Sequence, residues 1–336
     1  MEFTRGGRLE VRITPADVGK RVSVRRLTSS AGAPATFTDA VGVLTSWNEG
    51  VLLITRRTGE TVRIPEASLV AGKVVPAEPA RRRGPAADFP ELARVTARAW
   101  QPVESERLGE WELRASSGFT RRANSVLPLG DPGLPLDDAL ARVRTWYEDR
   151  GLPAYVQAAT GAAGTQEELC TELETRGWRR EVSAEVRIGA LAPIGDLDAE
   201  VERVRLARSV DEAWLQRYQR SGVPGPHVLK ALLQVVGSGP SVWFASVPGV
   251  MGGPPAAIGR CVVDGRWAGF MAVEVDPAYR RQGLATSVMT ALARRALEEG
   301  ASAAWLQVES DNDGARALYD GMGFATHHRY HHFRAA

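Results

Sequence analysis

Short runs in which apolar and polar residues alternate occupy the first quarter of the chain. They are rich in Val, Ile, Leu and Thr, and turn sequences at Asn48–Gly50 and Thr58–Glu60 separate them, which is the pattern of half-buried strands. Several short strands so close together predict a small barrel, because closing a sheet removes its exposed edges. We therefore predict an all-β barrel within residues 1–76. Its strands are expected in KRVSVRRL, DAVGVLTSW, GVLLITRR and ETVRIP.

After this region the apolar pattern changes to helical periods that alternate with strand-like runs. The segment 77–88 between the two regions is rich in Pro and Ala and includes Arg81–Arg83, which is typical of an exposed linker. Beyond it, a series of helix, strand, helix and Gly-aromatic pair occurs twice, and both copies open with Ala-Leu-Ala-Arg. We therefore predict an α/β (α+β) fold in two mixed-sheet repeats, over residues 89–190 and 196–336.

Composition sets limits on the class of protein. Apolar residues make up 44% of the chain and charged residues 24%, no run of eighteen apolar residues occurs, and the N-terminus has no apolar signal-peptide core. These features predict a cytoplasmic protein without membrane contact. Cys170 and Cys261 lie outside any Cys-x-x-Cys pair and are interpreted as buried thiols in a reducing compartment.

Charge is unevenly distributed along the chain. Residues 1–83 hold fourteen Lys and Arg against eight Asp and Glu, whereas the remainder has an excess of four negative charges. The basic barrel is expected either to contact nucleic acid or a protein surface, or to act only as a packing module, and both alternatives stay open. The negative remainder is compatible with a cationic acceptor.

A glycine-containing turn between a strand and a long helix is the first sign of chemistry. A strand-like run ends in Val273-Glu274-Val275, and Arg280-Arg281-Gln282-Gly283-Leu284-Ala285-Thr286 leads into a helical period. The first amides of a helix have no helical partner and form the positive end of its dipole. Two arginines add charge and two small residues let an anion approach the backbone, so the turn predicts a pyrophosphate site. It is neither a P-loop nor a Rossmann fingerprint.

This turn and a second motif resemble the GNAT superfamily of N-acetyltransferases. The cofactor signature of that family, Arg/Gln-x-x-Gly-x-Gly/Ala, matches residues 280–285. The family's Asn-x-x-Ala-x-x-Leu-Tyr-x-x-x-Gly-Phe matches residues 312–324. The resemblance covers residues 240–333 closely and implies acetyl-CoA as co-substrate, with no metal. The cofactor-binding residues that it implies are Val273, Glu274, Val275, Arg280, Arg281, Gln282, Gly283, Leu284, Ala285, Thr286, Asn312, Ala315 and Tyr319.

Acetyl transfer to an amine requires a neutral amine, a stabilised thioester oxygen and a proton for the leaving thiolate. Tyr319, at the family's tyrosine position, is the candidate proton donor, because a phenol stays protonated at neutral pH. The family's glutamate base is replaced here by Gln307. Glu309 lies on the same face of the expected strand, and Glu274 precedes the turn. Either carboxylate is a candidate base acting through water, with ordinary solvated carboxylates as the open alternative.

The first repeat departs from the family pattern. It has no cofactor signature, and aligning Gly177-Trp178 with Gly323-Phe324 places Leu173 where Tyr319 stands. We therefore predict that this repeat is degenerate, does not bind acetyl-CoA productively, and serves as scaffold and as one wall of the acceptor site. The loop Phe119–Gly130, with two arginines and an asparagine, has no assignment from the sequence.

The layout also bears on the acceptor. A small barrel before two GNAT repeats resembles actinobacterial proteins with an SH3-like barrel that are described as histone or nucleoid-protein acetyltransferases, which implies lysine side chains of a basic, DNA-associated protein. One alternative is a small amine, as in tandem-GNAT mycothiol synthases, and another is an acetyl-CoA-sensing module without turnover. The histidine-rich run 327–332 is interpreted as an aromatic closing strand rather than a metal site. The oligomeric state is not predicted.

Overall fold

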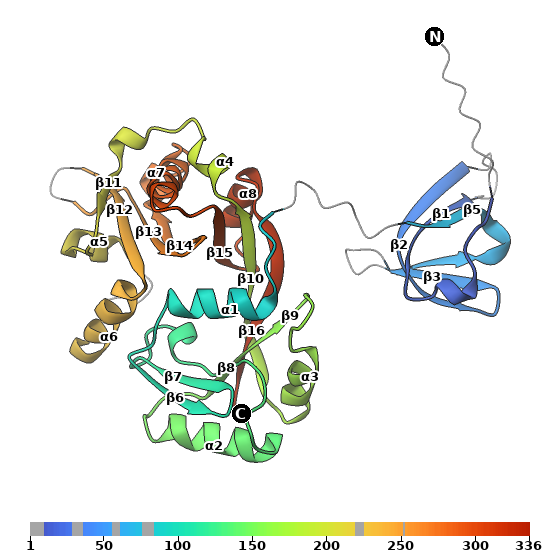
Figure 1. Cartoon of the computed structure of the whole chain (residues 1–336), viewed down its shortest axis with the longest axis horizontal. Helices are drawn as coiled ribbons and strands as arrows, with labels where there is room; N and C mark the ends of the chain where they lie inside the picture. Colours follow the sequence, from blue (N-terminus) through green and yellow to red (C-terminus); the bar gives the residue numbers. More distant parts are fainter. Residues whose placement is uncertain (1–9, 29–35, 56–60, 76–83, 219–224, 251–252) are drawn as a thin grey trace, which may run out of the picture. The chain divides into compact units, whose positions relative to one another are not determined.

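The computed structural model describes residues 10–28, 36–55, 61–75, 84–218, 225–250 and 253–336. The chain divides into two compact units, Met1–Arg82 and Arg83–Ala336, each of which is described by itself (Figure 1). The predicted turn Thr58–Glu60 and the arginines Arg81–Arg83 lie outside the described residues, as does most of the predicted linker.

The first unit is an all-β structure built on one five-stranded antiparallel sheet in the order β4-β3-β2-β1-β5. Alternate residues of β1, β3 and β4 are buried, as their apolar-polar alternation predicts. Four of the strands were predicted, and β5, which contains Ala and Gly, was not. The strands are β1 (Arg21–Thr28), β2 (Thr36–Asn48), β3 (Val51–Thr55), β4 (Thr61–Pro65) and β5 (Leu69–Val74).

The second unit is organised around an eight-stranded sheet in the order β11-β12-β13-β14-β15-β10-β16-β9. A three-stranded sheet, β6-β7-β8, adjoins it through one parallel bridge between Val126 and Val156. The strands are β6 (Glu104–Leu108), β7 (Trp111–Ala115), β8 (Leu127–Pro128), β9 (Tyr155–Thr160), β10 (Arg179–Ala190), β11 (Arg205–Ala207), β12 (Ser241–Val247), β13 (Ala257–Asp264), β14 (Trp267–Val275), β15 (Ala303–Glu309) and β16 (Ala325–Arg334).

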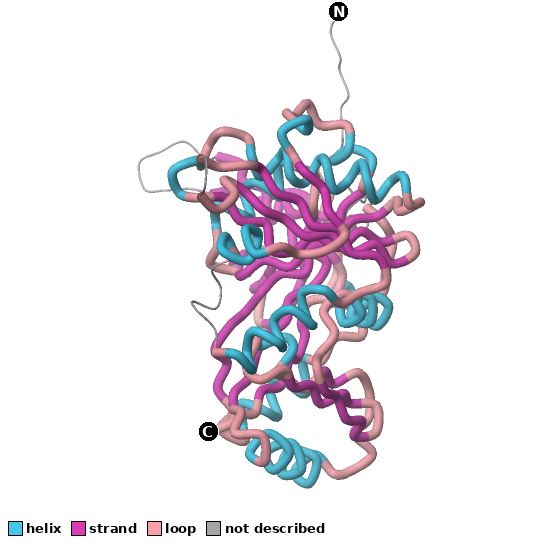
Figure 2. Tube along the Cα trace, turned by 90° about the vertical axis from the view of Figure 1, so that its left-hand side faces the viewer, coloured by secondary structure: helices cyan, strands magenta, loops and turns pink. Residues whose placement is uncertain are grey.

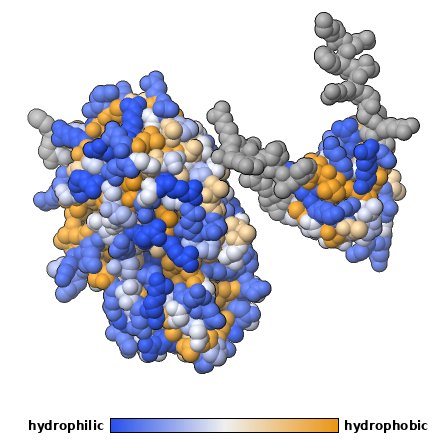
Figure 3. All heavy atoms as spheres, in the orientation of Figure 1, coloured by the Kyte–Doolittle hydropathy of each residue, from blue (hydrophilic) through white to orange (hydrophobic). Residues whose placement is uncertain are grey.

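Helices cover both faces of this long sheet, whose strands pass between them (Figure 2). Leu306 of β15 packs in the same cluster as helices α7 and α8, whereas its neighbour Trp305 packs in the cluster of α1 and α6. In the view of Figure 3 the surface of this unit is mostly hydrophilic, with scattered apolar residues. The helices are α1 (Phe89–Arg98), α2 (Leu136–Glu148), α3 (Glu167–Thr175), α4 (Ala192–Gly195), α5 (Glu212–Arg217), α6 (Pro226–Gly237), α7 (Leu284–Glu298) and α8 (Asp313–Gly321).

The two repeats share the sheet by exchanging their closing strands. β10, which closes the first repeat, lies between β15 and β16, whereas β16, which closes the second, lies between β10 and β9. The aligned helix ends have the same geometry, because Trp178 N donates to Leu173 O and Phe324 N donates to Tyr319 O at 2.9 and 3.0 Å. The predicted fold class is confirmed, and the boundary between the repeats stays a prediction.

The structure bears on two expectations from composition, the state of the cysteines and the absence of a membrane-spanning helix. Cys170 and Cys261 are both buried free thiols, and burial raises the pKa of the Cys261 thiol to about 12. In the described part of the chain, no helix combines the length and the apolar character needed to cross a membrane.

Candidate active site

The candidate site is centred on a gap between two parallel strands. β14 and β15 are paired from Trp267–Ala303 to Phe270–Leu306, and the registered pairs stop there. On the other side of β14, Asp276 N donates to Ala256 O, just before β13, at 2.9 Å. Since successive residues of a strand direct their peptide groups to opposite neighbours, those of Val273 and Val275 point into the gap. The predicted strand-like edge is therefore available to a ligand.

A bulge in β14 sets which side chains lie on each side of the sheet. The register with β13 shifts between Ile258 and Arg260, and Ala272 opposite has φ 51°, as in a strand with one extra residue. Val273 and Val275 consequently pack on the α7 side. Glu274 pairs with Ile258, which belongs to the cluster of α1 and α6, so its side chain lies on the opposite side.

The chain between β14 and α7 is fixed by Asp276. Its carboxylate accepts from Ala278 N at 2.8 Å and from the guanidinium of Arg217. These hydrogen bonds, together with the charge of Arg217, hold the pKa of Asp276 below its ordinary value. Arg217 is buried and also donates to Pro255 O at 2.7 Å. The direction in which the chain enters the glycine turn is therefore determined by a contact with a buried arginine.

The glycine turn has the conformation of an anion-binding nest. Arg281 and Gly283 have φ values of 61° and 77°, with Gln282 between them, and such alternation turns successive N–H groups into one concavity. The first helical hydrogen bond runs from Ser287 N to Gly283 O. The amides of Leu284, Ala285 and Thr286 consequently have no helical acceptor.

The glycine is required for a reason that differs from the one expected. A Cβ atom added to Gly283 would meet no atom within 4 Å, but the left-handed φ of this residue disfavours any side chain. Backbone conformation rather than space therefore selects glycine here. Arg280 and Arg281 are exposed, and neither is in an ion pair with any described residue, so both are available to an anion.

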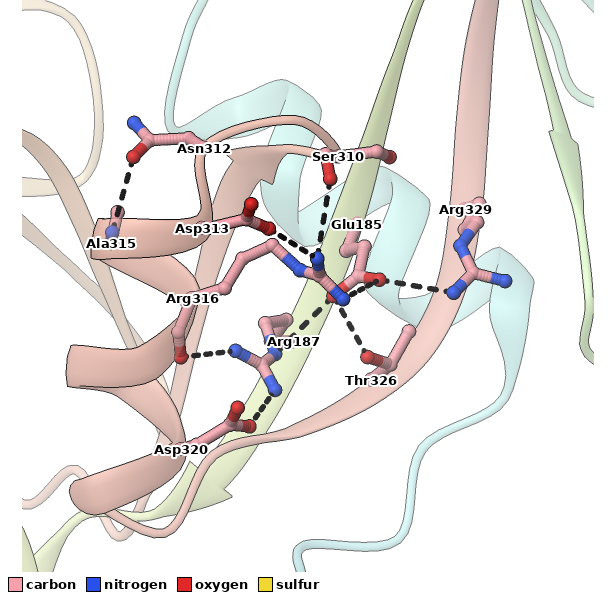
Figure 4. Close-up of polar contacts among 10 residues, drawn as sticks. All are labelled: Glu185, Arg187, Ser310, Asn312, Asp313, Ala315, Arg316, Asp320, Thr326 and Arg329. Atoms are coloured by element: carbon pink, nitrogen blue, oxygen red, sulfur yellow. Dashed lines mark hydrogen bonds and ion pairs between the residues drawn. The ribbon is translucent and has the colours of Figure 1, made fainter. Parts of the chain in front are cut away.

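Helix α8 places Tyr319 on the α7 side of the gap. Asn312 begins the helix by accepting from Ala315 N through Oδ1 at 3.1 Å (Figure 4). Tyr319 is 9% exposed and lies edge-on to Phe324, with ring centroids 6.0 Å apart. It belongs to the same apolar cluster as Leu284, the first residue of α7. The two predicted motifs are therefore brought together.

A buried carboxylate fastens α8 to the closing strands. Glu185 of β10 is 2% exposed, and it accepts from Arg329 and Thr326 at 3.0 Å and lies 3.5 Å from Arg316 of α8 (Figure 4). Burial alone raises the pKa of Glu185, but the hydrogen bonds and charges of these partners outweigh it and hold the pKa below its ordinary value. Neighbouring Arg187 donates to Arg316 O at 3.0 Å. A strand of the first repeat thus positions the tyrosine helix of the second.

A cavity of about 750 Å³ lies on the opposite side of the sheet. Gln307 and Glu309 of β15 line it just beyond the last pair of β14 and β15. Its other walls come from the sheet, from the first repeat and from α6. They are formed by Ser117–Arg122, Pro153, Tyr155, Val182, Ala184, Val228, Val308, Tyr330 and His332.

The sequence did not identify the loop Ser117–Arg122 as part of a site. Asn124 holds it by accepting from Ser116 N and Gly118 N at 2.8 and 3.0 Å, and by donating to Thr120 O at 2.7 Å. Arg122 then reaches across and donates to Gln307 Oε1. The adjacent arginines and Asn124 were the available signal, but their partners are too distant in the sequence to be inferred.

Comparisons with known proteins identify the family. Residues 86–333 match the family described as "Probable histone acetyltransferase Rv0428c C-terminal", and residues 16–73 match "Rv0428c N-terminal Sm-like domain". The chain belongs to this family of GNAT acetyltransferases. It is 27% identical to "Probable histone acetyltransferase Rv0428c" of Mycobacterium tuberculosis, over 93% of each chain.

Two solved structures share the GNAT fold. A GCN5-related N-acetyltransferase from Kribbella flavida is 16% identical with a TM-score of 0.53, over 74% of this chain and 96% of its own. A tandem GNAT protein from the clavulanic acid biosynthesis pathway is 14% identical with a TM-score of 0.53, over 76% and 91%. The predicted class of enzyme, a GNAT N-acetyltransferase, is confirmed, and the barrel before it is of the Sm-like kind.

The corresponding gap in the first GNAT repeat is closed by the chain itself. Val126 N donates to Tyr155 O, and Gln157 N donates to Val126 O. The chain just before β8 is therefore paired in parallel with β9, as β14 is with β15. The next residue whose peptide group faces β9 is Pro128, which has no N–H. Its carbonyl accepts from Gln166 Nε2. The amide oxygen of Gln166 accepts from Ala159 N at 2.8 Å, so one side chain bridges the two strands.

The histidines of strand β16 make hydrogen bonds within the sheet and to the chain just before α1. His331 lies 2.7 Å from Ser183 Oγ and 2.9 Å from Thr160 Oγ1, and His327 lies 3.0 Å from Ala87 O. Among the described residues, no three His, Cys, Asp or Glu side chains are grouped so that they could hold a metal ion.

Proposed function

We propose that the chain transfers the acetyl group of acetyl-CoA to a primary amine, with the thioester lying in the gap between β14 and β15. The observation that carries this proposal is the position of the gap. It has the amide nest and Tyr319 on one side and a cavity lined by Gln307 and Glu309 on the other. A cofactor entering from the α7 side would present its acetyl group to an amine in the cavity.

The cofactor would be bound mainly by the backbone. The amides of Arg281–Thr286 would hold the pyrophosphate, with Arg280 and Arg281 adding charge. The pantetheine arm would pair with Val273 and Val275 as an added strand. Asn312 and Ala315 at the start of α8 would border the same arm.

The chemistry would be direct transfer. The neutral amine attacks the thioester carbonyl, the new N–C bond forms, and the C–S bond breaks. The N–H group of Val273, which points into the gap, would stabilise the developing oxyanion. Tyr319 would donate its proton to the departing thiolate. The proton lost by the amine would pass through water to Glu309, with Glu274 as the second candidate because the bulge turns it to the same side.

Two acceptor classes have separate support. The name of the M. tuberculosis relative supports a lysine side chain of a basic, DNA-associated protein. The walls that the first repeat adds to the cavity support a small amine, because a volume of about 750 Å³ is typical of a small-molecule site. A screen of amines and basic peptides with labelled acetyl-CoA, read by mass spectrometry, distinguishes them.

Tyr319→Phe tests the catalytic assignment. Removing the phenolic hydroxyl should lower kcat by about 100-fold, which is typical for loss of a general acid. The Kd of acetyl-CoA should stay nearly unchanged, because the ring and its contact with Phe324 remain. Steady-state assays measure kcat, and calorimetry on the same preparation measures the Kd of acetyl-CoA. Full turnover in this variant would remove the role of Tyr319.

A further inference from the structure

The cavity on the acceptor side has an excess of positive charge. Arg122 is half-buried, donates to the neutral Gln307 and lies over the Trp100 ring, with its guanidinium carbon 5.1 Å from the ring centroid. Nearby Arg114 is buried and bonds only neutral groups, namely Ser125 and Gln157, at 2.8–2.9 Å. Neither arginine is in an ion pair with a described carboxylate. Buried cations are normally paired, whereas buried Arg114 and half-buried Arg122 have no carboxylate partner among the described residues.

His332 adds an unsatisfied donor to the same cavity. It is 3% exposed, it lines the cavity, and neither ring nitrogen has a hydrogen-bond partner among the described residues. Burial and the charges of Arg114, Arg122 and Arg121 lower the pKa of His332 to about 3. The ring is therefore neutral at pH 7, with one N–H to donate. Buried polar groups without partners are rare in proteins and usually mark a missing ligand or water.

The negative end of the cavity lies at the mouth of the gap. Glu309 lines the cavity two residues beyond Gln307, which Arg122 contacts. Glu274 lies on the same side of the sheet. Arg121 is the one lining arginine with an acidic neighbour, Glu181, at 3.9 Å. The cavity therefore offers the carboxylate of Glu309 where the amine would meet the thioester, and cations on the wall from the first repeat.

We propose that the acceptor is a small zwitterion, a primary amine whose own carboxylate or phosphate is bound by Arg122 and His332 while its amine lies near Glu309. This inference rests on the proposed function and names its substrate class. The anionic group supplies the negative partner that Arg122 lacks and accepts from the ring N–H of His332. A lysine of a basic protein would bring further cations to this wall.

Matched pairs of amines test the preference in the full-length chain. Phenylalanine is compared with phenethylamine, lysine with cadaverine, and phosphoethanolamine with ethanolamine, so that each pair differs in one anionic group. We expect kcat/KM to be at least tenfold higher for the acid-bearing member of a pair. The carboxylate and phosphate pairs show which anion is preferred. Higher kcat/KM for the amines that lack an acid, or for a basic peptide, would overturn the proposal.

Substitutions of Arg122 test the residue. Arg122→Gln should raise KM for the acid-bearing amine about 10- to 100-fold, because a charge-assisted hydrogen bond is lost, and should leave the KM for acetyl-CoA unchanged. Arg122→Lys should restore part of the loss. Arg142→Gln, which removes an exposed arginine of α2 that pairs with Glu106 of β6, is the matched control and should have no effect. If Arg122→Gln leaves the ratio of kcat/KM within each pair of amines unchanged, Arg122 does not bind the anionic group.

A binding readout separates this proposal from the proposed function. The ring resonances of His332 should shift on titration with phenylalanine or phosphoethanolamine and not with their acid-free partners, whether or not acetyl-CoA is bound. Acetylation of basic peptides without such a shift would leave the proposed function standing and reject the zwitterion. A shift in protein that gives no heat with acetyl-CoA would show that the cavity binds the zwitterion but would reject acetyl transfer, and with it the role of the zwitterion as acceptor. If neither the His332 shift nor heat with acetyl-CoA is observed, both the zwitterion and the proposed function are rejected.

Discussion

Gly283 occupies a backbone conformation that disfavours any side chain, at the point where α7 begins. Its φ of 77° and that of Arg281, 61°, turn the amides of the turn toward one point. The arginine itself bears the cost of a left-handed conformation, about 1–2 kcal/mol. Strain of this kind persists where the surrounding structure holds it, and here Asp276 and Arg217 fix the preceding turn.

Gly283→Ala tests this conformation at the scale of one residue. The substitution should cost about 1 kcal/mol in that backbone region and tilt the amides, so acetyl-CoA binding should weaken about fivefold or more. Gly237→Ala, at the end of α6, also has open space for a Cβ but no left-handed φ, and it should bind acetyl-CoA normally. Calorimetry measures both. Equal affinity in the two variants would contradict the assignment of the turn.

The sequence predicted single residues best where a motif is continuous. Arg280–Thr286 and Tyr319 were expected in the site, and the structure brings their elements together. Arg122 and His332 were not expected, because their proximity depends on a loop and a strand that are about 200 residues apart in the chain. Local patterns carry no information about such a contact. The roles of all these residues stay predictions until they are measured.

At the scale of elements, the tyrosine helix is positioned by strands from both repeats. Glu185 of β10 contacts Arg316 of α8 and Arg329 of β16, and Arg187 adds bonds to the Arg316 carbonyl and to Asp320 (Figure 4). The sequence predicted four strands of the barrel and the strand that ends at Val275, because their apolar patterns are strong. It did not predict β5, β6, β8 or β11, and it could not reveal that β10 and β16 are exchanged, since the pattern of a strand does not name its neighbour.

Glu185→Gln tests this anchoring. Removing the charge leaves the arginines around it without their anion, so the free energy of unfolding should fall by about 3 kcal/mol, and kcat should fall because α8 is less well held. Glu298→Gln removes an exposed carboxylate that pairs with Arg295 and should change stability by less than about 0.5 kcal/mol. Urea unfolding at pH 7 compares them. Equal midpoints and slopes would show that the cluster contributes no net stability.

The same carboxylate predicts a dependence on pH. The pKa of Glu185 is held below its ordinary value in the folded chain, so its contribution to stability is present above the unfolded pKa, near 4.5, and is lost as the pH falls through the folded pKa. Unfolding measured between pH 7 and pH 3 should therefore show a smaller loss of stability in Glu185→Gln than in the parent. Parallel curves would contradict the assignment.

At the scale of the whole molecule, the chain combines a barrel unit with two GNAT repeats, of which only one has an open gap. Pro128 and Gln166 close the gap of the first repeat, and α2 begins with Asp137 and Asp138, where a phosphate would be repelled. The sequence showed the loss of the signature in this repeat, but not that a side chain fills the gap. The first repeat instead contributes the arginine wall of the cavity.

Removal of the barrel tests the independence of the units. A chain of residues 84–336 should keep its acetyl-CoA affinity within about twofold, because every residue assigned to the site lies in the second unit. It should also acetylate small amines at the parent rate. If the barrel contacts nucleic acid, only the full chain should show salt-dependent binding to DNA. A large loss of acetyl-CoA affinity on truncation would show that the barrel completes the site.

We propose that one backbone cradle per chain, at the start of α7, binds acetyl-CoA beside Tyr319. Isothermal calorimetry of the full-length protein with acetyl-CoA tests it most directly. We expect saturation at one molecule per chain, with the affinity reduced in Gly283→Ala and nearly unchanged in Tyr319→Phe. Absence of heat from folded protein, or two equivalent sites per chain, would contradict it.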